Sequence, residues 1–312
     1  MVAARRSNGI LRSRKHPSPG GGQREQRMAH SERPVAILGL GIIGSIWARN
    51  LAADGITVRS WNRSPKPDAP GWCADAVEAV RGAQVVALVL SDGPVTSDIL
   101  QRILPHLEPD AVVVQHATIG VDETRALGKA VQQRGLAYLD MPFTGSKPAA
   151  EARETVYFIG DDNGSFARVE QLYTRLSRAR LAIGPVGSAA AIKLAMNLTI
   201  AASYQAMAES FTLAKAAGIS PETYWQVLDL NIARSGLADL KRPKLDQQDW
   251  SPQFSIKHLH KDLSLAMQLA HSVNRQLPQT ERLSASYAER LAAGDGDLDF
   301  AAMLRLIDPE AQ

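Results

Sequence analysis

Residues 35–61 read VAILGLGIIGSIWARNLAADGITVRSW, and the architecture follows from their order. An apolar run, 35–38, ends at Gly39. A proline-free helical pattern then begins near Ile42, and a second apolar run ends at Trp61. This order predicts a strand, a tight turn, a helix and a second strand, which together form the first unit of a parallel α/β sheet.

Further apolar runs follow, with room for a helix between most of them. They read VVALVL (85–90), AVVVQHA (111–117), LAYLDMP (136–142) and TVYFIG (155–160). Continuous rather than alternating apolar residues indicate strands buried on both faces, so these runs predict a doubly wound, Rossmann-type α/β sheet covered by helices. We expect this domain to span residues 34–186.

Beyond residue 186 the chain changes to strong helix formers. Residues 188–217 contain no proline and precede Gly218, which predicts one helix of about 45 Å, long enough to pass between two domains. Ser220 and Pro221 then form a helix start, and no later stretch has a strand pattern. We expect residues 187–312 to be an all-helical C-terminal domain joined by this long helix.

The positive charge of the chain is concentrated in its first residues. Residues 1–33 carry eight Lys or Arg and two Glu, a net charge of +6, which leaves −3 on the rest of a chain whose total is +3. The body therefore has no basic stripe for a phosphate backbone, and we expect no nucleic-acid partner. The segment PSPGGGQREQR predicts a disordered basic tail at residues 1–33, with an organelle transit peptide or a start at Met28 as alternatives.

Membrane, disulfide and metal chemistry all lack their usual sequence signals. The run of about eighteen apolar residues that a membrane helix needs is absent. Cys73 is the only cysteine, which excludes an intramolecular disulfide and a thiolate cluster and favours a cytoplasmic protein, or an organelle matrix if the tail is a transit peptide. His258 and His260 cannot share a helix face at a spacing of two, so we predict no metal site.

The glycines after the first strand predict a dinucleotide site. Gly39 would permit the tight turn, Gly41 would let a diphosphate approach backbone N–H groups, and Gly44 would allow close contact between helix and strand. The helix N-terminus favours an anion at this position. The predicted cofactor contacts here are Gly39, Leu40, Gly41, Ile42, Ile43 and Gly44.

The end of the second strand favours NADP over NAD. An NAD-selective site would place an acidic residue there, whereas this chain has Asn62, Arg63 and Ser64. A guanidinium can bind a 2′-phosphate through two parallel hydrogen bonds, which a ribose hydroxyl cannot match. A solvated surface arginine is the alternative interpretation of Arg63.

Four segments, in order and spacing, resemble the β-hydroxyacid dehydrogenase family, which includes 3-hydroxyisobutyrate dehydrogenase and the glyoxylate/succinic semialdehyde reductases. They are GLGIIGSIWARNLAADGITVRSWNRS (39–64), DMPFTGSKPAAEA (140–152), GPVGSAAAIKLAMN (184–197) and KDLSLAMQLA (261–270). The resemblance implies an NADPH-dependent oxidoreductase that interconverts a small aldehyde- or keto-acid and its hydroxy acid. It also implies a homodimer or homotetramer and a small carboxylate-bearing substrate.

The resemblance also implies roles for individual residues. Lys193 corresponds to the catalytic general acid/base, and Asn197 to an asparagine that helps to hold the substrate and the lysine. The implied substrate-binding residues are Thr118, Thr144, Gly145, Ser146, Phe254 and Asp262. The resemblance adds Leu90, Thr118 and Lys261 to the cofactor-binding set.

Lys193 and Asn197 are four residues apart on the expected long helix, so both project from one face. A lysine ammonium can stabilise an oxyanion and donate a proton, and partial burial lowers its pKa towards neutrality. Without the resemblance, a helix lysine whose amine extends to solvent would be an equally good interpretation.

The chain departs from the family pattern at two positions that bear on the substrate. Thr144 replaces the usual serine, and Arg153 stands near the substrate loop where glycine is usual, which leaves the substrate open. Two other functions stay open: an imine reductase, and a catalytically silent NADP-binding module used for protein interaction. Because both kinds of relative typically lack the catalytic lysine, Lys193 argues against them.

Overall fold

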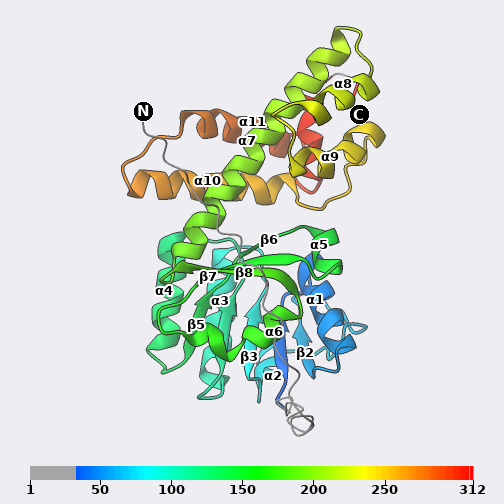
Figure 1. Cartoon of the computed structure of the whole chain (residues 1–312). Helices are drawn as coiled ribbons and strands as arrows, with labels where there is room; N and C mark the ends of the chain where they lie inside the picture. The colour runs from blue at the N-terminus through cyan, green and yellow to red at the C-terminus, as the bar shows by residue number, and fades with distance from the viewer. Residues whose placement is uncertain (1–32, 309, 312) are drawn as a thin grey trace, which may run out of the picture. The chain divides into compact units, whose positions relative to one another are not determined.

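The computed structural model describes residues 33–308 and 310–311. The predicted strands form the core of one sheet, with the order β2-β1-β3-β4-β5-β7-β6 and with β8 paired to β7 (Figure 1). Its first five strands run parallel in register. They are β1 (Val35–Leu38), β2 (Val58–Trp61), β3 (Val85–Leu88), β4 (Val112–Gln115) and β5 (Ala137–Asp140). The chain reverses direction across the sheet between β1 and β3, which is where ligands bind in such folds.

Helices cover both faces of this sheet, as the continuous apolar runs predicted. Every residue of β1, β3 and β4 is buried. On one face, the apolar side chains pack against three helices, α2 (Ala76–Val80), α3 (Gly93–Ile103) and α4 (Val121–Gln132). On the other face they pack against α1 (Ile42–Ala53), α5 (Lys147–Glu151) and α6 (Glu170–Thr174). The predicted Rossmann-type α/β class is confirmed.

The far edge of the sheet differs from the parallel arrangement that the sequence predicted. β7 (Thr155–Gly160) runs antiparallel to β5 and to the short β6 (Phe143–Thr144), and parallel to β8 (Ser177–Gly184). β6 continues in the direction of β5, and the chain returns through α5 into β7, which therefore pairs antiparallel with both. Two short 3-10 turns, Leu104–His106 and Ser165–Arg168, complete this part of the chain.

The long helix predicted after residue 186 is α7 (Ser188–Ala216), of 29 residues. It starts beside the sheet and continues among the C-terminal helices (Figure 1), so that Arg33–Gln312 forms a single compact unit. Its N-terminus is capped from the sheet, because the Asp140 carboxylate accepts hydrogen bonds from the N–H groups of Gly187 (2.9 Å) and Ala190 (3.0 Å). This cap fixes where α7 leaves the sheet.

The remaining described elements are helical, in agreement with the prediction. They are α8 (Pro221–Leu230), α9 (Gly236–Gln247), α10 (Ile256–Ser272), α11 (Pro278–Ala292) and a 3-10 helix, Phe300–Leu306. Ser220 caps α8 through the N–H of Thr223, as the Ser220-Pro221 pair predicted. A search of the described residues finds no helix that is both long and apolar enough to cross a membrane.

The predicted basic tail lies outside the described residues, apart from Arg33. The Arg33 guanidinium donates hydrogen bonds to both Asp110 carboxylate oxygens, at 2.8 and 2.6 Å, and to the Gly82 carbonyl at 3.1 Å. Arg33 therefore belongs to the folded part of the chain rather than to the tail.

Candidate active site

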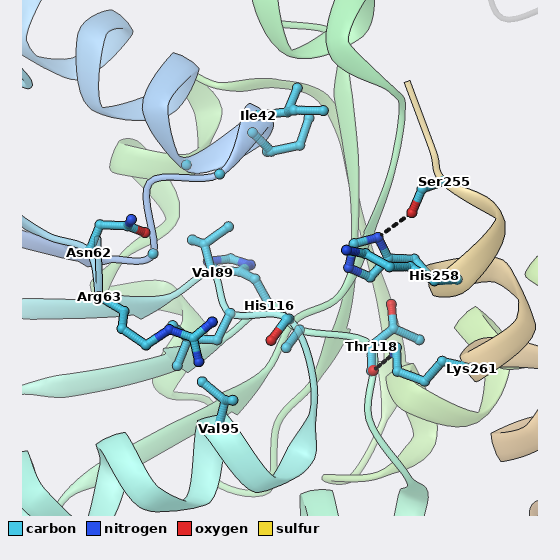
Figure 2. Close-up of a pocket in the computed structure, with 18 of the residues that line it drawn as sticks. Ile42, Asn62, Arg63, Val89, Val95, His116, Thr118, Ser255, His258 and Lys261 are labelled. Atoms are coloured by element: carbon cyan, nitrogen blue, oxygen red, sulfur yellow. Dashed lines mark hydrogen bonds between the residues drawn. The ribbon is translucent and has the colours of Figure 1, made fainter. Parts of the chain in front are cut away.

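A cavity of about 800 Å³, the larger cavity, lies at the carboxyl ends of the parallel strands. Its walls come from the turns after β1 to β4 on one side and from residues 252–262 on the other (Figure 2). A second cavity of about 400 Å³, the smaller cavity, shares five lining residues with it. They are Ile43, Thr118, Phe143, Gln253 and Phe254. The two cavities therefore meet along a common wall.

The glycine turn fits a diphosphate closely. Gly39 has a φ of 106°, and a Cβ there would lie 2.1 Å from the Val89 carbonyl oxygen. A Cβ on Gly44 would lie 1.9 Å from the Gly39 carbonyl, whereas a Cβ on Gly41 would meet no atom within 4 Å. Gly41 thus leaves open space at the start of α1, where no side chain caps the helix. Free N–H groups beside open space suit an anion.

Leu40 is the one predicted cofactor contact that the structure does not place at the cavity. Its side chain is fully buried. Its N–H donates to the Asn62 side-chain oxygen at 2.9 Å, and its carbonyl accepts from Ser45 and Lys66. Because its side chain lies in the core and its backbone groups are already paired, Leu40 presents no group to a ligand in the cavity.

The loop after β2 presents Arg63 to the larger cavity (Figure 2). Arg63 is exposed, and its guanidinium forms no hydrogen bond or ion pair with another described residue. Asn62 instead organises the loop, since it accepts from Leu40 and donates to the Ser64 carbonyl at 2.9 Å. The acidic residues that line this cavity lie elsewhere, on α3, on α10 and near residue 297. A cation without a partner at the end of β2 fits a phosphate better than a ribose hydroxyl.

A chain of charged contacts connects α10 to the sheet and to α7. The Lys261 amine donates to the Thr118 carbonyl and to the Asp262 carboxylate, the latter at 2.7 Å. The other oxygen of Asp262 accepts from the Asn197 amide at 2.6 Å. All three α10 and α7 side chains line a cavity: Lys261 and Asp262 the larger one, and Asn197 the smaller.

Lys193 projects into the smaller cavity from the same face of α7 as Asn197. The Lys193 side chain is half-buried, and its amine has no hydrogen-bond partner in the described part of the chain. Burial lowers the pKa of the Lys193 amine to about 8. The Lys261 ammonium adds to this shift, and the nearby Asp262 carboxylate opposes it. The side-chain oxygen of Asn197 is also buried without a partner. An unpaired amine and an unpaired acceptor thus face one space.

The loop after β5 forms another wall of the smaller cavity, with Thr144, Gly145 and Ser146. Gly145 has a φ of 114°, which a side chain would strain, and a Cβ there would lie 2.9 Å from the Ala149 side chain. Hydroxyl groups beside a glycine turn form a suitable cradle for a carboxylate.

The structure brings together nearly all the predicted site residues. The larger cavity is lined by Gly39, Gly41, Ile42, Ile43, Gly44, Asn62, Arg63, Ser64, Leu90, Thr118, Phe254, Lys261 and Asp262. The smaller cavity is lined by Thr118, Thr144, Gly145, Ser146, Lys193, Asn197 and Phe254. Asp262, predicted as a substrate contact, lies at the larger cavity and reaches the smaller one only through Asn197.

Arg153 does not belong to the substrate site. Its guanidinium pairs with both oxygens of Asp54, at 2.7 and 2.9 Å, and with the Asn50 carbonyl. The side chain therefore ties α5 to the end of α1 and lines neither cavity. The departure from glycine at this position changes a structural contact and carries no information about the substrate.

The histidines have structural environments. His116 is buried between the Met141 carbonyl (2.7 Å) and the Tyr173 hydroxyl (2.8 Å), and burial lowers its pKa to about 3, so its ring is neutral. His258 interacts with the Ser255 hydroxyl at 2.7 Å (Figure 2). A search of the described residues finds no group of three metal-ligating side chains.

Sequence reasoning missed Lys241, Gln253 and Phe300, which also line the smaller cavity. None follows a strand or belongs to a local motif. Lys241 lies on α9 among other charged residues, so nothing in its neighbourhood distinguishes it from a surface lysine. Its burial depends on contacts that are distant in the sequence.

Two family models match consecutive parts of the chain. Residues 34–184 match the NAD binding domain of 6-phosphogluconate dehydrogenase, and residues 187–307 match the NAD-binding domain of NADP-dependent 3-hydroxyisobutyrate dehydrogenase. Glyoxylate/succinic semialdehyde reductase 1 of Arabidopsis thaliana is 25% identical over 88% of this chain and 98% of its own length. The cytokine-like nuclear factor N-PAC of Mus musculus is 26% identical, but this chain spans only 51% of it.

A solved structure agrees with these matches. Mycobacterium tuberculosis 3-hydroxyisobutyrate dehydrogenase with L-serine superposes with a TM-score of 0.79 at 25% identity, over 88% of this chain and 99% of that one. The fold, the dinucleotide site and these relatives define an NAD(P)-dependent dehydrogenase that acts on CH–OH groups. The chain belongs to the 3-hydroxyisobutyrate dehydrogenase-like β-hydroxyacid dehydrogenase family.

Proposed function

We propose that this protein uses NADPH to reduce a small aldehyde- or keto-acid, such as glyoxylate or succinic semialdehyde, or catalyses the reverse oxidation. The observation that carries the proposal is the Lys193 amine. It has a pKa of about 8 because of burial, lacks a hydrogen-bond partner among the described residues, and lines a cavity that adjoins the dinucleotide site.

In this proposal the chain's own residues position the substrate and move one proton. NADPH, when bound, supplies the hydride. The ammonium of Lys193 stabilises the charge that develops on the carbonyl oxygen and donates a proton to it. The unpaired oxygen of Asn197 accepts a hydrogen bond from that lysine or from the product hydroxyl. Thr144, Gly145 and Ser146 hold a carboxylate adjacent to the carbonyl.

The preference for NADPH rests on Arg63. Its guanidinium is exposed at the end of β2, lines the larger cavity and lacks a partner among the described residues. Ser64 beside it adds a hydroxyl donor, and no acidic residue lies there to accept bonds from the two ribose hydroxyls. These features support a 2′-phosphate at this position.

The test is a substrate panel in which oxidation of NADPH is measured by its absorbance. Glyoxylate, succinic semialdehyde, methylmalonate semialdehyde and a cyclic imine are compared with the same protein. Turnover of an acid aldehyde supports the proposal. Turnover of the imine alone would make the protein an imine reductase, and tight NADPH binding without any turnover would make it a silent binding module.

The relative named as a nuclear factor keeps the silent module under consideration. Lys193 favours an enzyme, because a partly desolvated lysine without a hydrogen-bond partner destabilises the folded protein, and a catalytic role would account for its presence. A binding module would gain nothing from a lowered lysine pKa.

Assembly and compartment are inferred from exposed apolar side chains and from the single cysteine. Four apolar side chains, Leu213, Val227, Leu230 and Ile232, are exposed on and near α7 and α8, which supports a homodimer or homotetramer. The single free cysteine, Cys73, is buried and favours the cytoplasm or another reducing compartment. Light scattering of the purified protein measures the oligomeric state, and localisation of the full-length protein in cells identifies the compartment.

A further inference from the structure

A second buried amine lies in the wall of the smaller cavity, and the proposed chemistry does not use it. Lys241 on α9 is only 1% exposed, and its amine lies 2.6 Å from the Asp299 carboxylate and 4.1 Å from the centre of the Phe300 ring. Lys241 and Phe300 both line the smaller cavity together with Lys193. The cavity therefore has a lysine on α7 and another on α9.

Lys244, one helical turn further along α9, shows what a structural lysine looks like here. Its amine, also buried, has four oxygens of Asp249 and Ser251 within hydrogen-bond distance, at 2.6 to 3.3 Å, to share its three N–H donors, and it lies at neither cavity. An ammonium has three N–H donors. Lys241, by contrast, has one oxygen acceptor within the described part of the chain, which leaves donors for an oxygen in the cavity.

Asp299 holds the Lys241 amine at this position. One Asp299 oxygen accepts from Lys241 and from the N–H of Ala301 (3.0 Å), and the other accepts from the N–H groups of Gln253 (2.9 Å) and Phe254 (3.1 Å). The carboxylate is fully satisfied and fixed by four donors. Burial lowers the pKa of Lys241 and the Asp299 charge opposes that shift, so an incoming anion would further favour the ammonium form.

The charge of the smaller cavity points to an anionic ligand. Among the described residues that line it, Lys193 and Lys241 are the two charged ones, and no carboxylate lines it. Apolar side chains line the same cavity, among them Ile200, Leu237, Leu240 and Phe300. A cavity that combines two amines with apolar walls suits a ligand with an apolar spacer between two polar ends.

We propose that Lys241 binds a substrate carboxylate that methylene groups separate from the reacting carbonyl, as in succinic semialdehyde. The inference rests on the proposed function and deepens it. The carboxylate of an α-oxo acid such as glyoxylate occupies the cradle of Thr144, Gly145 and Ser146, whereas the remote carboxylate of a longer acid binds at Lys241. One cavity thus has two carboxylate positions, and Lys241 determines specificity for the longer acids.

The test compares Lys241→Met with Lys244→Met on three substrates: succinic semialdehyde, glyoxylate and the uncharged butanal. Loss of one charge-assisted hydrogen bond predicts a fall of about 10- to 100-fold in kcat/KM for succinic semialdehyde, mostly through KM. Activity towards glyoxylate and butanal, and the Kd for NADPH, stay within about threefold of the wild type, which is less than the loss of one such bond. Lys244→Met leaves the ratio between the substrates unchanged.

Two results would overturn the inference. An equal loss on all three substrates would assign Lys241 a structural role through Asp299, and no loss on succinic semialdehyde would remove it from recognition. If Lys241→Met does not fold, the wild-type protein provides the test, because a site for the remote carboxylate should make kcat/KM higher for succinic semialdehyde than for the uncharged butanal. Equal values for the two substrates would overturn the inference. If the wild-type protein still reduces glyoxylate, the proposed function is retained. If it reduces neither glyoxylate nor succinic semialdehyde, both the inference about Lys241 and the proposed function are wrong.

Discussion

The larger and smaller cavities of this protein are built in opposite ways. The larger one is formed by turns that directly follow β1 to β4, and its shape depends on local backbone conformation, such as the positive φ of Gly39. The smaller one combines α7, α9, the loop after β5 and the segment near Phe254. Most of the larger cavity is thus set by the turns of the parallel sheet, with residues 252–262 closing its other side, whereas the smaller cavity has no such local framework.

The polar groups of the two cavities differ as well. Around the glycine turn, the Leu40 N–H is paired with Asn62, whereas Arg63 and the N–H groups that start α1 are left for a ligand. In the smaller cavity, the amine of Lys193 and the oxygen of Asn197 are unpaired although they are partly or fully buried. Unpaired buried groups cost stability, so their presence marks where chemistry is expected.

The largest expected effect is the loss of catalysis in Lys193→Ala. Removal of a general acid should lower kcat by about 10²- to 10⁴-fold, because the other described amine that lines the smaller cavity, Lys241, is held in an ion pair with Asp299. NADPH affinity, measured by fluorescence titration, should not change, since Lys193 does not line the larger cavity.

Lys147→Ala is the matched control for this prediction. Lys147 is next to the cradle but is exposed, lies 3.9 Å from Glu151 and lines neither cavity, so its loss should leave kcat close to that of the wild type. Retained activity in Lys193→Ala would contradict the proposed role and would favour the view of Lys193 as an ordinary helix lysine.

On the side of the larger cavity, Arg63→Ala tests cofactor selection. Loss of the guanidinium should raise the Kd for NADPH about 10- to 100-fold and leave that for NADH nearly unchanged. Arg59→Ala provides the comparison, because Arg59 lies on β2, just before the loop that carries Arg63, but pairs with Glu78 at 3.6 Å and does not line the cavity. Equal losses for both cofactors in Arg63→Ala would show that Arg63 does not read the 2′-phosphate.

The pH dependence of the reaction should report the Lys193 amine. Reduction requires the ammonium, so kcat/KM should be level below the pKa of about 8 and should fall tenfold per pH unit above it. Oxidation of the hydroxy acid requires the neutral amine and should show the opposite slope. Profiles recorded in both directions check this, and a level reduction profile up to pH 9.5 would rule out proton donation by Lys193.

The contrast between local turns and contacts of distant segments also explains which parts of the site could be predicted from the sequence. The glycine turn and Arg63 could be predicted because their roles depend on residues that are close to them in the sequence. Lys241 was not, since its burial depends on Asp299, 58 residues away, and on the Phe300 ring. Arg153 misled for the same reason: it is near the substrate loop in sequence, but its side chain extends to Asp54.

The strands at the far edge were missed for a different reason. β6 has only two residues, too few for any periodic signal, and β8 reads SRARLAIG, in which charged residues interrupt the apolar pattern. An exposed edge strand tolerates such residues, so its sequence resembles a loop. The antiparallel arrangement of β7 is not visible in the composition of the strand, because its run TVYFIG is apolar like those of the parallel strands.

The last expected effect is on stability rather than on activity and concerns Asp140, which caps α7 from the end of β5. Burial raises the pKa of Asp140 to about 6 in the folded protein, above its ordinary value of 3.8, although N–H groups of α7 oppose the shift. An acid with a raised folded pKa makes the folded state less stable as pH rises between these values. Asp140→Asn removes that cost, so its free energy of unfolding relative to the wild type should increase by up to about 3 kcal/mol from pH 4 to pH 7.

Asp75→Asn should show the opposite sign. Asp75 caps α2 near the surface, and although burial opposes the shift, the N–H groups of Val77 and Glu78 and the charge of Arg102 hold its pKa below the ordinary value. Its ionised form therefore stabilises the folded state, fully so above about pH 4, and the asparagine variant should lose stability relative to the wild type as pH rises towards that value. Urea unfolding measures both slopes, for the Asp140 variant between about pH 4.5 and pH 7.5 and for the Asp75 variant between about pH 2.5 and pH 4.5. The same sign for both would mean that the Asp140 carboxylate is not destabilised by burial, and that the sheet holds α7 through a favourable charge.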